Sequence, residues 1–123
     1  MIAGTVNRRH EAVITLPVFD STGQKHEIQT LLDTGFTGSL TLPTSLIETF
    51  DLAWRSRSSA ILANGVVEEC DIYAAVVIWD GVKRSVLVQS MENVPLLGMA
   101  MLVGYDLRAR VIVDGHVEIE AVP

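Results

Sequence analysis

The chain has 123 residues, enough for one domain with a hydrophobic core but marginal for two. Hydrophobic residues make up 49% of it, which argues against intrinsic disorder. The formal net charge is −6 and no dense basic cluster occurs, which argues against a nucleic-acid-binding protein. We therefore expect a single domain over residues 1–123.

The sequence also gives expectations about the location of the protein and about cofactors. No apolar run approaches the roughly 20 residues needed to cross a bilayer, and the first ten residues do not form a secretory signal. A cytoplasmic protein without a membrane partner is the expectation. The single Cys70 is interpreted as a small apolar residue that is buried or half-buried. The three histidines are scattered, so we expect no metal and no cofactor.

Short strands separated by turns dominate the first half of the chain. Alternating apolar residues predict strands over residues 5–19 and 25–33, joined by a turn over residues 20–24. A further short apolar strand, Leu40-Thr41-Leu42, precedes a short helix over residues 43–50. Pro43 suits the first position of that helix.

The second half is predicted to consist mostly of hairpins. Asn64-Gly65 predicts a tight turn between strands over residues 57–63 and 66–77, because both turn positions need positive φ. Asp80-Gly81 is expected to join strands over residues 72–79 and 82–88. A short helix over residues 99–104 is followed by a last hairpin, with strands over residues 110–113 and 117–122. Many short strands are typical of a small sandwich or barrel.

One carboxylate stands out because an apolar run leads directly to it. Leu31 and Leu32 precede Asp33, and Thr34 and Gly35 follow. Burying an ionised carboxylate without partners is costly, so Asp33 has either a structural role in a turn or a chemical role. The structural alternative is an Asx-turn, in which the side chain of Asp33 accepts a hydrogen bond from the backbone two residues on.

The motif Asp33-Thr34-Gly35 resembles the active-site loop of aspartic proteases, specifically the short, single-motif retropepsin type. Leu40-Thr41-Leu42-Pro43 follows it, Asn64-Gly65 stands at the distance of a flap, and Leu96-Leu97-Gly98 comes late in the chain. This order covers nearly the whole chain. The resemblance implies an all-β fold, a small closed β-barrel of retropepsin (acid protease) type with one or two short helices.

The resemblance also implies roles for individual residues. Asp33 would be catalytic, the Thr34 hydroxyl would bond across a dimer axis, and Gly35 would bring backbone N–H groups to the carboxylate. The flap tip that closes over substrate would be formed by Ala63, Asn64 and Gly65. Leu97 and Gly98 would lie beneath the active-site loop, where no side chain fits at the glycine. The alternatives are a generic turn threonine, a plain surface hairpin and a glycine at a helix entry.

Peptide hydrolysis by this chemistry needs two carboxylates about 3 Å apart that share one proton. The chain has one such motif. Asp20-Ser21-Thr22-Gly23 looks like the motif with an insertion, but its position between two strands favours a hairpin turn. The second carboxylate would therefore come from another copy, since a twofold axis places a residue beside its own equivalent. We expect an aspartic endopeptidase that is a homodimer and acts on a peptide or protein.

Two residues depart from the family pattern. Phe36 stands where many members have Ala or Ser and offers no hydroxyl to the carboxylate. A shift of the pair's pKa values toward neutrality is the resulting hypothesis, and a pH optimum below about 4 would count against it. Met99 stands where Arg or Asn is common. These departures support a second reading, a catalytically silent module for dimerisation or peptide binding. A third is an acidic ligand-binding barrel with Asp33 as a turn cap.

Overall fold

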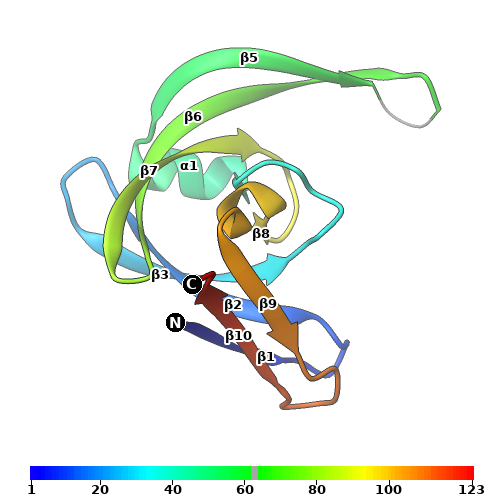
Figure 1. The fold of residues 1–123 in the computed structure, drawn as a ribbon. Coiled ribbons are helices and arrows are strands. Elements are labelled where there is room, and N and C mark those ends of the chain that lie inside the picture. Colours follow the sequence, from blue (N-terminus) through cyan, green and yellow to red (C-terminus); the bar gives the residue numbers. More distant parts are fainter. Residues whose placement is uncertain (62–63) are drawn as a thin grey trace.

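The structure is a computed structural model that describes residues 1–61 and 64–123. Within these residues the chain is mostly β-strand, with one α-helix and one short 3-10 helix (Figure 1). The elements, in chain order, are β1 (Ile2–Val6), β2 (Ala12–Phe19), β3 (Lys25–Leu32), β4 (Leu40–Leu42), α1 (Thr44–Phe50), β5 (Ala53–Ile61), β6 (Val67–Trp79), β7 (Val82–Ser90), β8 (Leu96–Leu97), η1 (Met99–Leu102), β9 (Tyr105–Ala109) and β10 (His116–Ala121).

The described strands form one sheet that closes on itself in part. Its order is β5-β6-β7-β4-β8-β3-β2-β1-β10-β9, and β6 pairs additionally with β2 through Val18–Val77 and Phe19–Val76. This extra pairing joins β6, β7, β4, β8, β3 and β2 into a ring of strands. Strand β5 extends the sheet beyond β6, and β1, β10 and β9 extend it beyond β2. The predicted all-β class is confirmed.

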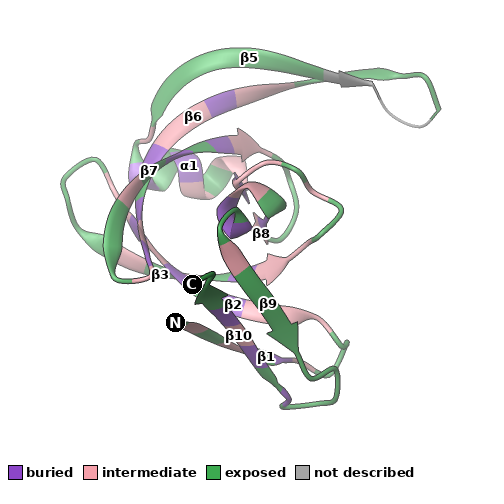
Figure 2. Cartoon of the chain, in the orientation of Figure 1, coloured by how far each residue is buried: buried purple, intermediate pink, exposed green. Residues whose placement is uncertain are grey.

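The core lies inside the ring because alternate residues of each strand point inward. On β2, for example, Ile14, Leu16 and Val18 are fully buried, while Thr15 between them is exposed. Helix α1 carries both buried and exposed residues (Figure 2). Its buried Ile47 belongs to the same cluster. The other fully buried large side chains are Val6, Leu40, Leu42, Val77, Val88, Leu97, Met101, Val117 and Ile119. No helix among the described residues has the length and apolar character required to span a bilayer.

Of the two predicted tight turns, the one at Asp80-Gly81 is present, whereas the β5–β6 ladder, whose last described pair is Ile61 opposite Val67, does not centre on Asn64-Gly65. Asp80 and Gly81 both have positive φ, 53° and 78°, as a type I′ turn between β6 and β7 requires. At the tip of the β5–β6 hairpin, Gly65 has φ 82° and the Asn64 side chain accepts a hydrogen bond from the Val66 N–H at 3.0 Å. Ala63, the third predicted tip residue, lies outside the described residues.

The single strand predicted over residues 5–19 is wrong. The chain turns between β1 and β2, where the Asn7 side chain accepts hydrogen bonds from the Arg9 and Glu11 N–H groups, each at 2.9 Å. His10 takes positive φ in this turn. One asparagine side chain thus satisfies two backbone donors and reverses the chain within an otherwise alternating pattern.

Four other element boundaries also differ from the prediction. β6 is one long strand, so the two strands predicted over residues 66–77 and 72–79 are the same element, and β5 begins at Ala53. Pro43 caps α1 from the extended position before it instead of occupying its first turn. The helix predicted over residues 99–104 is a 3-10 helix over Met99–Leu102. Cys70 is half-buried on β6, as predicted, and burial raises the pKa of its thiol.

The last hairpin is shifted from its predicted position. Strand β9 pairs with β10 from Tyr105–Ala121 to Ala109–Val117, whereas residues 110–113, predicted as a strand, lie in the connection. A Cβ at Gly115 would lie 1.9 Å from the Arg110 carbonyl oxygen, so the chain packs against itself there. Both edges of β10 are occupied within the chain, by β1 and β9.

The β2–β3 turn is the plain hairpin that was predicted for Asp20. Its Oδ1 accepts hydrogen bonds from the Thr22 hydroxyl and from the Thr22 and Gln24 N–H groups, at 2.6, 2.9 and 3.0 Å. Its Oδ2 lies 2.8 Å from His26 Nε2. The Thr22 hydroxyl and then His26 hold the pKa of Asp20 well below its ordinary value.

This depressed pKa predicts a pH-dependent effect of Asp20→Asn. Because the folded-state pKa is lowered, the stabilisation is fully present above the unfolded pKa of about 3.9 and is lost as pH falls toward the folded value. The variant should unfold at a lower temperature than wild type at pH 7, and the difference should shrink below about pH 4. Thermal unfolding followed by circular dichroism measures it. A difference that stays constant or grows in acid would contradict the assignment.

Candidate active site

The acidic loop, residues 33–39, begins where β3 ends beside the short strand β8. The two strands are parallel, with Leu31 opposite Leu96 and Leu32 opposite Leu97. The Leu31 N–H donates to the Pro95 carbonyl and the Asp33 N–H donates to the Leu97 carbonyl, both at 2.9 Å. The backbone of Asp33 is therefore fixed by the sheet, and only its side chain extends into the loop.

Asp33 is half-buried as a residue, and its carboxylate is held by the backbone of its own loop. The Gly35 N–H donates to Oδ1 at 2.9 Å, and the Phe36 N–H donates to the Asp33 main-chain oxygen at 3.1 Å. This is the geometry of an Asx-turn, the alternative that the sequence left open. Thr34 is exposed, and its hydroxyl makes no hydrogen bond to any residue that the structure describes. One oxygen of the Asp33 carboxylate is bound by the loop, and the neighbouring Thr34 hydroxyl is exposed. Both groups can therefore still contact another molecule.

The ring of Phe36 fills the space between two glycines. A Cβ on Gly38 would lie 2.6 Å from the Phe36 Cζ, and a Cβ on Gly98 would lie 2.5 Å from the Phe36 Cδ2. The Gly98 Cβ would also lie 2.1 Å from the Gly38 carbonyl oxygen, a contact that real side chains never make. Gly98 thus lies directly against the acidic loop, and its lack of a side chain allows the two backbones to approach.

Three backbone hydrogen bonds fasten the acidic loop to the β8–η1 segment. The Gly98 N–H donates to the Ser39 carbonyl at 2.9 Å, the Met99 N–H to the Phe36 carbonyl at 2.8 Å, and the Ala100 N–H to the Gly38 carbonyl at 3.1 Å. Leu97, whose carbonyl accepts the hydrogen bond from the Asp33 N–H, is fully buried. The loop is therefore clamped at both ends, and Asp33 is presented by rigid backbone.

Two supporting side chains were not predicted from the sequence. The buried Thr41 accepts a hydrogen bond from the Leu96 N–H at 2.9 Å and so aligns β8. The Glu92 carboxylate accepts hydrogen bonds from the N–H and hydroxyl of Thr44 in the first turn of α1, and these lower the pKa of Glu92. A threonine within an apolar strand was the available signal for Thr41. Glu92 gave none, because it lies 48 residues from Thr44.

An open hollow of about 850 Å³ borders the Asp33 side of the loop. The hollow is lined by Asn7, Arg8, Arg9, Glu11, Val13, Gln29, Leu31, Asp33, Asn93, Val94, Pro95 and Leu96. Of the predicted site residues, Asp33, Thr34, Gly35 and Phe36 lie in the acidic loop, and Leu97 and Gly98 lie against that loop. The exposed Asn64 and Gly65 belong to the long β5–β6 arm, which projects beyond the ring (Figure 1), and they do not line this hollow.

Comparison with known proteins assigns the fold. No family model matches the chain, and no curated protein matches it. The fold is that of a retropepsin-like aspartic protease. This is shown by similarity to the crystal structure of a retropepsin-like aspartic protease from Rickettsia conorii, with a TM-score of 0.58 over 99% of this chain and 91% of that one. The identity between the two is 15%.

Proposed function

We propose that the chain is an aspartic endopeptidase that works as a homodimer, with residues 1–123 as one retropepsin-like domain whose ring of strands is a small closed barrel. The observation that carries the proposal is Asp33 itself. Its carboxylate stands at the end of β3 in a loop clamped by β8 and η1, with one oxygen held by the Gly35 N–H. The similarity in fold to a retropepsin-like aspartic protease supports the same role for this acid.

In the proposed dimer the two Asp33 carboxylates share one proton, because two adjacent carboxylates do not both ionise. The ionised carboxylate takes a proton from the attacking water, and the protonated one donates a hydrogen bond to the scissile carbonyl. The resulting titration belongs to the pair as a unit. In this proposal the exposed Thr34 hydroxyl bonds across the dimer axis, and Asn64 and Gly65 close over a peptide substrate.

A catalytically silent module for dimerisation or peptide binding is the second candidate, and the packing of Phe36 is the observation that favours it. The Phe36 ring occupies the space between Gly38 and Gly98 and so brings a bulky apolar group into the acidic loop. Met99, which is exposed, supplies no polar group next to the loop.

Peptide turnover separates the two candidates. The protein is incubated with a peptide library between pH 3 and 8, a range that brackets the reference carboxyl and imidazole pKa values. We expect cleavage that a statine-type transition-state analogue inhibits, because the analogue reproduces the tetrahedral geometry formed at the scissile carbonyl. Binding of peptides without cleavage at every pH would favour the silent module.

A further inference from the structure

An arginine on the inner side of β7 is the feature from which the next inference comes. Alternate residues of this strand point into the ring, and Val86 and Val88 at two of these positions are buried. Arg84 continues the same alternation next to the Asp80-Gly81 turn, opposite the buried Val77 of β6, and it is half-buried. A charged side chain therefore occupies an inward position where the neighbouring positions are apolar.

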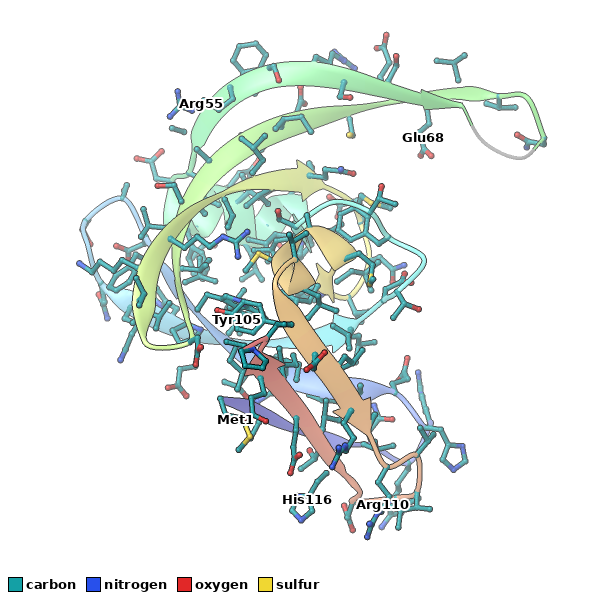
Figure 3. All side chains as sticks on the ribbon, viewed as in Figure 1. Met1, Arg55, Glu68, Tyr105, Arg110 and His116 are labelled. Atoms are coloured by element: carbon teal, nitrogen blue, oxygen red, sulfur yellow. The ribbon has the colours of Figure 1, made fainter. Side chains whose placement is uncertain are left out.

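Arg84 lies in the wall of a cavity of about 350 Å³ at this end of the ring. The other lining residues are Trp79, Asp80, Val82, Lys83 and Tyr105. The Tyr105 side chain extends from the start of β9 toward the β6–β7 turn (Figure 3), and its ring packs edge-on against Trp79 with 6.0 Å between the ring centres. Among the described residues, none that lines this cavity also lines the hollow beside Asp33, so the two sites are separate.

The guanidinium of Arg84 has hydrogen-bond donors that are not used within the chain. Its Nη2 donates to the Ala100 carbonyl at 3.3 Å, and Arg84 forms no ion pair with any described residue. Asp80 in the same cavity has other contacts, with Oδ1 2.8 Å from the Met1 nitrogen and Oδ2 3.5 Å from the Tyr105 hydroxyl. An arginine withdrawn from water is normally paired, and a guanidinium carries five N–H donors. Arg84 can therefore bind an anion in the cavity.

Two other properties of the cavity also favour an anion. Lys83 and Arg84 bring two positive charges to its wall against the one negative charge of Asp80, although the whole chain has a formal net charge of −6. Trp79 is 4% exposed, and its Nε1 has no hydrogen-bond partner in the part of the chain that the structure describes. The cavity is thus richer in donors and positive charge than in acceptors.

We infer that this cavity binds a small carboxylic acid in its ionised form, with the carboxylate on Arg84 and the Tyr105 hydroxyl. Two carboxylate oxygens match two N–H groups of a guanidinium. The apolar part of the ligand lies against Val82, which is 64% exposed, and the Tyr105 ring. A single guanidinium beside Asp80 favours such a monoanion over the more highly charged phosphate. The volume is at the lower end of the range for ligand pockets, which suits a small molecule.

A carboxylate bound at Arg84 also stabilises the acidic loop through η1. Ala100, whose carbonyl accepts a hydrogen bond from Arg84, donates its own N–H to the Gly38 carbonyl at 3.1 Å. The ligand takes other N–H groups of the guanidinium, so the bond to Ala100 is kept and the arginine side chain is fixed in place. A ligand that binds only the folded state raises the unfolding temperature. We expect this rise in the wild type and not in Arg84→Gln.

Tryptophan fluorescence tests the site directly and makes no use of peptidase activity. Trp54→Phe removes the exposed tryptophan, so that Trp79 in the cavity wall is the only emitter left. The probe is sodium cyclohexanecarboxylate, which does not absorb where tryptophan does. We expect it to change the emission saturably, whereas sodium chloride at the same ionic strength should not. Arg84→Gln in this background should raise the dissociation constant roughly tenfold or more, because a charge-assisted hydrogen bond is lost.

Arg55→Gln is the matched control, because it makes the same charge change on β5, away from this cavity (Figure 3). It should leave the dissociation constant unchanged. Two milder variants decide the question if Arg84→Gln does not fold. Arg84→Lys keeps the charge but loses the planar pair of donors, and Tyr105→Phe removes only the hydroxyl, so each should weaken binding severalfold.

Four results would overturn the carboxylate site. The first is the absence of a saturable response to cyclohexanecarboxylate in Trp54→Phe, and the second is an equal response to chloride. The third is a dissociation constant that the substitutions at Arg84 and Tyr105 leave unchanged, or that Arg55→Gln raises as much as they do. The fourth is tighter binding of inorganic phosphate than of the carboxylate. None of these results bears on whether Asp33 supports peptide cleavage, so the proposed function stands or falls separately.

Discussion

Asp33→Asn is expected to reduce peptide hydrolysis by roughly 10²–10⁴-fold, the contribution usual for a positioned acid or base. The substitution removes both carboxylates of the proposed pair at once, because each copy contributes the same residue. The fold should be retained, since the amide oxygen of the introduced asparagine can still accept the hydrogen bond from the Gly35 N–H that Oδ1 accepts at 2.9 Å. Initial cleavage rates on a selected library peptide measure the effect.

Asp20→Asn is the matched control for this experiment. Asp20 also precedes a turn with a threonine and a glycine, but it bonds the backbone and hydroxyl of its own hairpin and does not line the hollow beside Asp33. The Asp20→Asn substitution should leave the cleavage rate of the folded protein unchanged at pH 7. Cleavage that survives Asp33→Asn would assign the activity to another group or to a contaminant.

Gly98→Ala is expected to destabilise the protein by about 3 kcal/mol, the upper end of the usual cost of overpacking. The added Cβ would lie 2.1 Å from the Gly38 carbonyl oxygen, a backbone atom that cannot move without breaking the hydrogen bond from Ala100. The acidic loop would be displaced from β8, so activity should fall together with stability. Urea unfolding monitored by circular dichroism gives the free energy of unfolding.

The neighbouring Gly38 supplies a matched comparison. A Cβ at Gly38 meets mainly the Phe36 ring, at 2.6 and 2.7 Å, so truncating that ring in Phe36→Ala should relieve the strain of Gly38→Ala. The same truncation cannot relieve Gly98→Ala, whose nearest obstacle is backbone. Equal rescue of both glycine variants, or rescue of neither, would show that Phe36 does not pack as described.

Residues whose local chemistry determines the backbone were the ones that the sequence predicted well. Asp80-Gly81 adopts the positive φ values that its turn type needs, and Asp20 bonds the backbone of its own hairpin. The strand leading to Asp33 ends where the apolar run ends. In each case a short stretch of chain contains the whole cause of its own conformation.

The predictions that were wrong concern residues whose conformation depends on distant or unusual contacts. The side chain of Asn7 breaks an apolar alternation that reads as continuous, so one strand was predicted where two exist. The apolar run Val111–Val113 resembles a strand more than β9 does, but the Ile112 N–H donates to the Arg110 carbonyl, and Gly115 lies directly against that carbonyl. The hydrogen bonds of Thr44 to Glu92 join residues 48 apart, and no local pattern predicts them.

The candidate site likewise combines features that the sequence predicts with features that it does not. The motif pointed to Asp33 and its loop, but the packing role of Phe36 was not predictable. Its ring lies between two glycines, Gly38 and Gly98, that are far apart in the sequence, and only the parallel pairing of β3 with β8 brings them together. The residue that departs from the family pattern is therefore accommodated by the backbone around it.

The central claim is that the carboxylates of two Asp33 residues, one from each copy, hold a single proton between them. A crystal structure of the dimer tests this most directly through the shortest distance between the two Asp33 carboxylate groups. The account predicts hydrogen-bonding contact, about 3 Å between oxygens. A dimer in which each Asp33 faces solvent, apart from its equivalent, would contradict it.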